Sequence, residues 1–264
     1  MEYSIEINSL ENLKTDCIIV GVFESNDLSP SAEFLNSTQK NFISQSFDYA
    51  ELTGKLGESL LVNWSSDNLM SRFLLIGLGK KNGLTDKNYR IALSTAAKVI
   101  KEANLKSAAC TFPELEIKDR DYQWKTRQVI EVFDDFLYQF NQCKSKIDNA
   151  LKTEKISIVV DASYERDAET GLRQGLAIAS AVAMAKQMAD LPGNICTPAY
   201  LSDQALKLAD THAKVSVEVL EESDMEKLGM GALLSVSRGS RQPAKLIAIN
   251  YQGGEKNRKP IVFI

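Results

Sequence analysis

Histidine is almost absent from this chain of 264 residues, because His212 is the only one. A zinc site built from several histidines is therefore excluded, and the HExxH motif of many metallopeptidases is missing. A serine triad needs a histidine base, so at most one such site is possible. A Cys196–His212 pair of nucleophile and base is not expected either, since nothing in the local sequence activates Cys196.

Closely spaced cysteines and long apolar runs are missing too. The four cysteines, Cys17, Cys110, Cys143 and Cys196, form no CxxC pair, which excludes a zinc knuckle and a thioredoxin-type site. Scattered cysteines in a chain of this size are typical of reduced thiols in the cytosol. No apolar run has the length of a membrane span, and the acidic N-terminus lacks the apolar region of a signal peptide. The sequence therefore predicts a cytoplasmic protein without a membrane partner.

An excess of positive charge is also lacking. The chain has 31 Lys and Arg against 35 Asp and Glu, a net charge of −4. This balance gives no general attraction to nucleic acid or to an anionic membrane. Nucleic acid is therefore not an expected partner. The net charge leaves open one way to bind nucleic acid, through a local basic patch. Such a patch could be made of Arg72, Lys80, Lys81, Lys87 and Arg90.

Up to residue 165, strand-like and helix-like segments alternate, which predicts an α/β fold with a mixed, mainly parallel sheet. The aromatic side chains of the segment 129–140 recur at helical spacing on one side, so Phe133, Phe136 and Phe140 are interpreted as core residues. The expected strands are Tyr3–Asn8, Asp16–Phe23, Ser59–Val62, Arg72–Gly77, Ser107–Phe112 and Lys155–Val160, and the expected helices are Lys87–Ala103 and 129–140.

Residues 166–191 have a different composition. Gly171, Gly175 and seven alanines dominate the segment, and apolar residues fall on all its sides. Small residues allow neighbouring backbones to approach closely, and apolarity on all sides is typical of a buried helix. We therefore predict one continuous, mostly buried helix that joins two domains.

The last part of the chain begins after the break at Pro192 and Gly193. Its final segment, Lys259–Ile264, is an apolar strand pattern that stops abruptly. We therefore expect the chain to be a fragment of a longer protein. The other expected elements are the helices Leu201–Ala209 and Glu221–Lys227, the second with a solvated acidic face, and the strands Val215–Leu220, Leu233–Val236 and Leu246–Ile249.

Two loops have features of anion sites. Gly77–Gly83 follows a strand and precedes a helix, but its GxGxxxG spacing differs from the dinucleotide fingerprint and from the Walker motif. A plain turn is the preferred interpretation, and a phosphate-binding turn is the alternative. Arg238–Arg241 is a compact basic loop that could hold a phosphate or a carboxylate, and here too a solvated turn is preferred.

Two longer segments carry a family resemblance. Asp190–Leu201 (DLPGNICTPAYL) and Met230–Ser240 (MGALLSVSRGS), the latter continued by residues 244–254 (AKLIAINYQGG), resemble the leucyl aminopeptidase family, also called cytosol aminopeptidase. Arg72–Lys80 (RFLLIGLGK) is similar to the N-terminal domain of that family, more weakly. The resemblance runs in order along most of the chain and is strongest from Gly171 onward.

The resemblance implies a macro-like N-terminal domain at residues 1–165, a connecting helix at 166–191 and the start of a zinc-peptidase-like catalytic domain at 192–264. In that family the metal-binding lysine and carboxylates lie in segments that have no counterpart here. No catalytic residue and no metal ligand is therefore identified in this chain, its substrate-binding residues stay unknown, and no metal is expected to bind it.

For the full-length protein, the resemblance implies a metallo-aminopeptidase. Two divalent ions, zinc or manganese, would activate a water molecule for the removal of N-terminal amino acids from peptides. The family also implies a homohexamer. The 264-residue chain alone is expected to be inactive. The alternatives are a non-catalytic macro-like binding module and a DNA-binding regulator.

Overall fold

The computed structural model divides the chain into two compact units, Met1–Lys186 (unit 1) and Gln187–Ile264 (unit 2). The domain boundaries expected after residues 165 and 191 stay predictions. The structure describes residues 1–7, 10–39, 41–48, 52–66, 69–147, 151–255 and 257–264.

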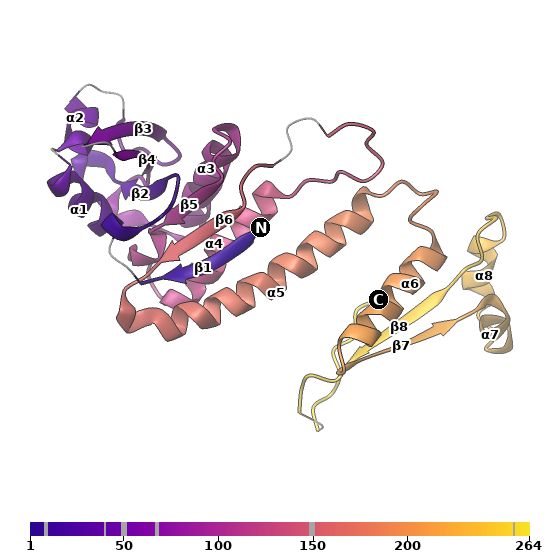
Figure 1. The fold of residues 1–264 in the computed structure, drawn as a ribbon. Coiled ribbons are helices and arrows are strands. Elements are labelled where there is room, and N and C mark those ends of the chain that lie inside the picture. The colour runs from indigo at the N-terminus through magenta and orange to yellow at the C-terminus, as the bar shows by residue number, and fades with distance from the viewer. Residues whose placement is uncertain (8–9, 40, 49–51, 67–68, 148–150, 256) are drawn as a thin grey trace. The chain divides into compact units, whose positions relative to one another are not determined.

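Unit 1 is built on a six-stranded sheet with the strand order β1-β6-β5-β2-β4-β3 (Figure 1). All neighbouring strands are parallel except β3 and β4, which form an antiparallel pair. The predicted α/β fold with a mixed, mainly parallel sheet is therefore confirmed. The expected end of the first strand, Asn8, lies outside the described residues. The strands are β1 (Glu2–Glu6), β2 (Ile18–Val22), β3 (Ser59–Ser66), β4 (Leu69–Gly77), β5 (Ser107–Cys110) and β6 (Lys155–Val159).

Helices cover both faces of this sheet. The two short helices α1 (Pro30–Thr38) and α2 (Phe42–Asp48) share one apolar cluster with β2 and β4. Neither helix is among the elements predicted from the sequence. The longer helices α3 (Asp86–Glu102) and α4 (Tyr122–Leu137) pack into a second cluster on the opposite face. Alternate residues of β2 enter the two clusters, which explains why this strand has no polar side chain.

The aromatic residues near the end of α4 are only partly in the core. Phe133 is fully buried, as predicted, because it lies on the face of α4 that meets the sheet. Phe136 is 37% exposed, and the Lys101 ammonium lies 5.8 Å from the centre of its ring. Phe140 follows the end of α4 and is half-buried. The interpretation of all three as core residues is therefore wrong for Phe136 and Phe140.

The helix α5 (Glu165–Asp190) is continuous, as predicted from its composition. Its glycines lie directly against α4. A Cβ atom at Gly171 would collide with the Gln123 carbonyl oxygen, and one at Gly175 would lie 2.8 Å from the Ile130 side chain. The two glycines thus let the backbones of the two helices approach closely.

The prediction that α5 is mostly buried is wrong. Its buried residues are Ala168, Gly171, Gly175 and Ala179, which form the narrow face against α4. Elsewhere on the helix, Leu176, Ile178 and Val182 are each about 40% exposed. The prediction rested on apolar residues around the whole circumference of α5. In the structure, the other described residues cover only one face of this helix.

Within the residues that the structure describes, unit 2 contains a two-stranded antiparallel sheet and, after the end of α5, three helices. The expected strand Leu233–Val236 is wrong, because these residues belong to α8, and Val236 is 87% exposed. The expected strand at Lys259–Ile264 is also wrong, since this segment forms no regular element and no described strand pairs with it. The elements are α6 (Pro198–Thr211), β7 (Val215–Leu220), α7 (Glu222–Lys227), α8 (Gly231–Ser237) and β8 (Leu246–Tyr251).

No helix in the described part of the chain combines the length and the apolar composition that a membrane span requires.

Candidate functional site

The carboxyl ends of β2 and β5 lie where open α/β sheets bind their ligands. Glu114 follows β5, and its carboxylate lies at the N-terminus of α1. The Ser31 amide nitrogen is 3.1 Å from each carboxylate oxygen, and the Ser31 hydroxyl is 2.5 Å from Oε2. Unpaired amides and the helix dipole favour a negative charge at this position. The N-terminus of α1 is therefore already occupied by a carboxyl group of the protein itself.

Burial perturbs the pKa of Glu114 and the pKa of Lys125, which both lie near this end of the sheet. Burial raises the pKa of Glu114, and the hydrogen bonds from Ser31 and Ser29 oppose this shift. Burial lowers the pKa of Lys125 to about 8. The Lys125 ammonium donates a hydrogen bond to the Leu115 carbonyl at 3.0 Å and lies 3.9 Å from the centre of the Tyr122 ring.

Neither Glu114 nor Lys125 is among the residues predicted from the sequence. The only local signal is an acidic residue placed directly after Pro113, at the end of a predicted strand. Its partner Ser31 is 83 positions away along the chain, so spacing could not reveal the pair.

The glycine-rich segment Gly77–Gly83 forms a structural turn. Gly79 has a φ of +77°, which favours glycine, and a Cβ atom at Gly77 would collide with the Lys55 carbonyl. A separate short helical turn, Lys81–Gly83, lies between these glycines and α3, whose N-cap is Thr85. The glycines therefore do not lie at the N-terminus of α3, where a phosphate would be bound. This geometry supports the plain-turn interpretation.

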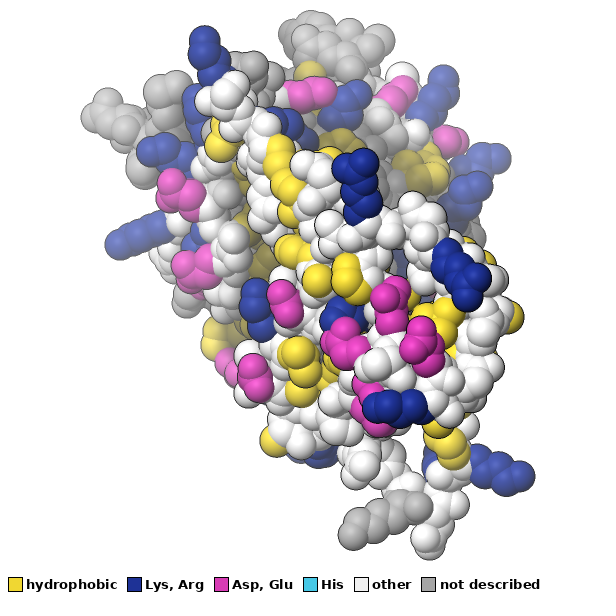
Figure 2. All heavy atoms as spheres, turned by 90° about the vertical axis from the view of Figure 1, so that its right-hand side faces the viewer, with side chains coloured by type: hydrophobic (Ala, Val, Ile, Leu, Met, Phe, Trp, Pro, Cys, Tyr) yellow, Lys and Arg dark blue, Asp and Glu magenta, His cyan; other side chains and the backbone are white. Residues whose placement is uncertain are grey.

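The basic residues that could form a local patch differ in their exposure and in their partners. Arg72 and Lys80 are exposed. Lys81 pairs with Asp27 at 3.5 Å, and the Arg90 Nε donates to Gln128 at 2.6 Å. Figure 2, which faces the right-hand side of Figure 1, shows both basic and acidic side chains on that face.

Cys196 and His212 lie at opposite ends of α6. Cys196 precedes the helix by two residues, and His212 is its C-cap. A helix of 14 residues is about 20 Å long at ~1.5 Å per residue. The two side chains therefore cannot form a catalytic pair across this helix.

The acidic helix α7 uses its carboxylates locally. Glu221 pairs with Lys245, Asp224 pairs with Lys227 at 3.3 Å, and Glu222 accepts a hydrogen bond from the Ala244 amide at 2.9 Å. These contacts support the interpretation of a surface helix over that of a metal site.

The basic loop Arg238–Arg241 borders a hollow of about 410 Å³ in unit 2. Arg238 and Ser240 line this hollow together with Glu222 and Glu226. A bound phosphate or carboxylate would therefore face two carboxylates as well as the arginine, which disfavours an anion site.

The described residues do not fit a metal centre of the kind implied by the resemblance. Among them, no three His, Cys, Asp or Glu side chains come together in a way that could hold a metal ion. No hydrolytic step through a metal can therefore be built from the described residues. That this chain contains no catalytic residue stays a prediction.

Comparisons with known proteins identify the class to which these units belong. The family model "Cytosol aminopeptidase family, N-terminal domain" matches residues 19–147. The model "Cytosol aminopeptidase family, catalytic domain" matches residues 183–264. The two models together span most of the chain, and the chain belongs to the cytosol aminopeptidase family.

Individual relatives agree with this assignment. The chain is 40% identical to a probable cytosol aminopeptidase of Dechloromonas aromatica and 38% identical to one of Nitrosospira multiformis. All of this chain is aligned in both cases, with 53% and 52% of the relative, respectively. The chain thus spans about half the length of the curated relatives it matches.

Solved structures show the same fold. A mutant of tomato leucine aminopeptidase matches with a TM-score of 0.78 at 19% identity, over 98% of this chain and 52% of the other. The bottromycin maturation enzyme BotP in complex with Mn matches with a TM-score of 0.68 at 19% identity, over 89% of this chain and 45% of the other.

Proposed function

We propose that residues 1–264 are the amino-terminal half of a leucyl aminopeptidase that removes N-terminal amino acids from peptides in the cytosol. One observation carries the proposal. Models of the N-terminal and catalytic domains of the family match this chain in that order, one in unit 1 and the other almost wholly in unit 2.

The complete enzyme is proposed to use two divalent ions, zinc or manganese, and to act as a homohexamer on peptides with a free α-amine. The manganese complex of BotP supports a metal-dependent relative. Because the described residues do not fit such a centre, no chemical step is assigned to them. Their proposed contribution is structural: they form unit 1 and the first elements of the catalytic domain.

The test compares two chains for hydrolysis of a leucyl chromogenic amide with added Mn²⁺. The first is residues 1–264. The second joins residues 1–264 to the remaining half of the Dechloromonas aromatica relative. We expect turnover from the joined chain only, and only on substrates with a free α-amine. The joined chain is also expected to bind metal and to form a hexamer.

Two outcomes would contradict the proposal. Turnover by residues 1–264 alone would show that the catalytic groups lie within this chain. A well-folded joined chain that binds metal but hydrolyses no aminoacyl amide would favour a non-catalytic role. The matched control is the relative's own complete protein, assayed under the same conditions.

A further inference from the structure

The two edge strands of the sheet in unit 1 differ in their protection. β1, at one edge, has five residues, and two of them are the acidic residues Glu2 and Glu6. β3, at the other edge, has eight residues, and none of them is charged or a proline (Figure 1). Short length, charged residues and proline are features that keep an edge strand from pairing with another chain. β1 has two of these three features, whereas β3 has none.

The hydrogen bonds between β3 and β4 show which backbone groups of β3 face outward. The Gly77 amide donates to the Glu58 carbonyl at 2.8 Å, so the carbonyl of residue 58 faces β4. In an antiparallel pair, successive residues direct both backbone groups alternately toward the neighbouring strand and away from it. The N–H and C=O groups of residues 59, 61, 63 and 65 therefore point to the free edge. Among the described residues, no backbone group outside the β3–β4 pair bonds to them.

Apolar side chains accompany these backbone groups. Leu60, Leu61 and Val62 are each half-buried, and Asn63 is exposed. Leu60 and Val62 pack on the cluster that contains α1 and α2, while Leu61 packs on the cluster of α3 and α4. Both faces of β3 thus keep apolar surface in contact with solvent, which a further strand at this edge would cover.

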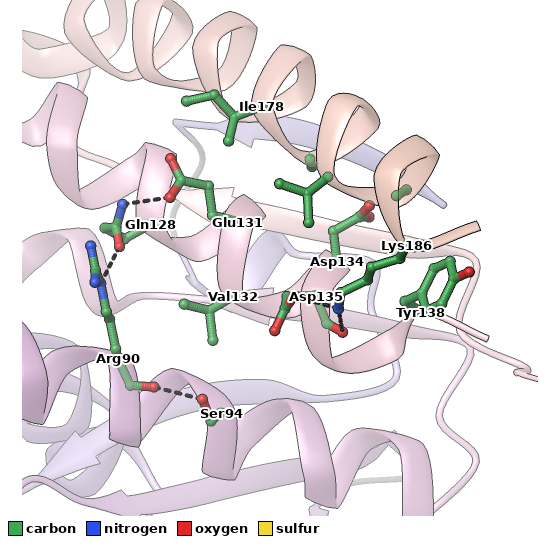
Figure 3. A pocket seen from close by; sticks show the side chains of 13 residues that line it. Arg90, Ser94, Gln128, Glu131, Val132, Asp134, Asp135, Tyr138, Ile178 and Lys186 are labelled. Atoms are coloured by element: carbon green, nitrogen blue, oxygen red, sulfur yellow. Dashed lines mark hydrogen bonds and ion pairs between the residues drawn. The ribbon is translucent and has the colours of Figure 1, made fainter. Parts of the chain in front are cut away.

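The exposed apolar surface of α5 is bordered by charges instead. Ile178 and Val182 line a hollow beside α4, where the Lys186 ammonium pairs with the Asp135 carboxylate (Figure 3). A partner at this hollow would need charges that match those of the pair. The edge of β3 imposes no such requirement, because the strand itself is uncharged.

A second copy of β3 fits this edge when it runs antiparallel about a two-fold axis at Val62. In this register residue 59 lies opposite residue 65 of the second copy, and Leu61 lies opposite Asn63. Both members of each pair direct their backbone groups outward, so every outward N–H meets a C=O. Val62 lies opposite Val62 of the second copy, in a non-hydrogen-bonded pair whose side chains approach closely. Because β3 is uncharged, the two strands bring no like charges together.

We propose that two copies of this chain pair through β3 and join their sheets into one continuous sheet. A two-fold dimer of this kind uses the same surface on both copies, so one neutral strand supplies both halves of the interface. The interface belongs entirely to unit 1, and the proposal is therefore independent of the proposed aminopeptidase activity.

The first test is sedimentation equilibrium of residues 1–264 over a wide range of protein concentration. We expect a reversible equilibrium between monomer and dimer. Asn63→Lys adds a charge at the edge and should raise the dissociation constant of the dimer by roughly tenfold or more. Asn63→Pro removes an outward N–H, which an edge strand tolerates, and should abolish the dimer. The control Gln174→Lys adds the same charge on the exposed surface of α5 and should dimerise like the unmodified chain.

Disulfide cross-linking tests the register. The exposed Cys143 and the half-buried Cys196 are first replaced by serine. Opposite residues of a non-hydrogen-bonded pair have Cα atoms ~4.5 Å apart, and a disulfide joins Cα atoms that are ~4.4–6.8 Å apart. Val62→Cys in this background should therefore form a covalent dimer on mild oxidation. Asn63→Cys should not, because its two copies are diagonal neighbours, ~7–8 Å apart.

Three results would overturn the proposal. A monomer at every concentration would show that the edge of β3 stays unpaired, and this result does not depend on the folding of any variant. A dimer whose dissociation constant neither Asn63 variant changes would place the contact elsewhere on the chain. Cross-linking of Asn63→Cys without cross-linking of Val62→Cys would reject the two-fold axis at Val62.

Discussion

Lys125 is a buried cation whose pKa is lowered to about 8 by burial, from a usual value of 10.5. The pKa of Lys125 is thus lower in the folded state than in the unfolded state. Where Lys125 is protonated in both states, its buried charge lowers the free energy of unfolding. The cost is full below about pH 8 and disappears as the pH rises toward 10.5. Lys125 therefore makes the folded state more stable, relative to the unfolded state, as the pH rises through this window.

The measurement compares thermal unfolding of the unmodified chain and of Lys125→Met between neutral pH and pH 10.5, the usual lysine pKa. The melting temperature of the unmodified chain should rise relative to that of the variant. Cys17 and Cys110, whose pKa values burial raises to about 12, affect both proteins equally and cancel in the difference. The control is Lys118→Met, at an exposed lysine. The melting temperature of this variant should change with pH in parallel with that of the unmodified chain. Parallel profiles for Lys125→Met as well would contradict the prediction.

At the scale of the element, the contact between α4 and α5 depends on glycine. Gly171→Ala should destabilise unit 1 by roughly 1–3 kcal/mol, because the new methyl group meets the Gln123 carbonyl and forces two packed helices apart. This loss outweighs the gain in helix propensity, which is at most about 1 kcal/mol. The free energy of unfolding from urea titration is the relevant measurement.

The control for this substitution is a helical glycine in open surroundings. Gly231 begins α8, and a Cβ atom there would meet no atom within 4 Å. Gly231→Ala should leave stability unchanged or raise it slightly. Equal effects of the two substitutions would mean that propensity, and not the approach of the helices, determines the role of Gly171.

The elements that sequence could predict are those with one clear period. The strand β2 is a short β-branched run, and α3 has apolar residues on one face only. The prediction of a strand at residues 233–236 was wrong because a short apolar run fits either a strand or a helix. The helix α1 has a start signal that hydrophobic periodicity does not detect, Ser29 as N-cap before Pro30.

Two long-range contacts of the structure were beyond the reach of sequence patterns. Glu114 meets Ser31, and Asp134 meets Tyr3, across 83 and 131 positions of chain. Such pairs arise because helices α1 and α4 pack against parts of the chain that are distant in sequence. A short motif cannot encode a contact of this kind, whereas the family resemblance rests on contiguous residues and could be recognised.

At the scale of the whole molecule, the two units differ in burial. All five residues of β2 are buried, whereas the last four residues of β8 are exposed. Amide hydrogens exchange slowly where opening requires disruption of a buried core. We predict that hydrogen exchange followed by mass spectrometry will show strong protection in β2 and β4 and rapid exchange in β8. Equal protection of β2 and β8 would contradict this prediction.

The side chain of Glu114 occupies the N-terminus of α1, so any dissolved anion would have to compete with it for this position. Because Glu114 is tethered to the same fold, its effective concentration beside the Ser31 amide exceeds that of a dissolved anion. A phosphate or nucleotide would have to displace Glu114 and leave that carboxylate without its hydrogen bonds. We therefore expect that phosphate compounds do not bind at the N-terminus of α1 while Glu114 occupies it.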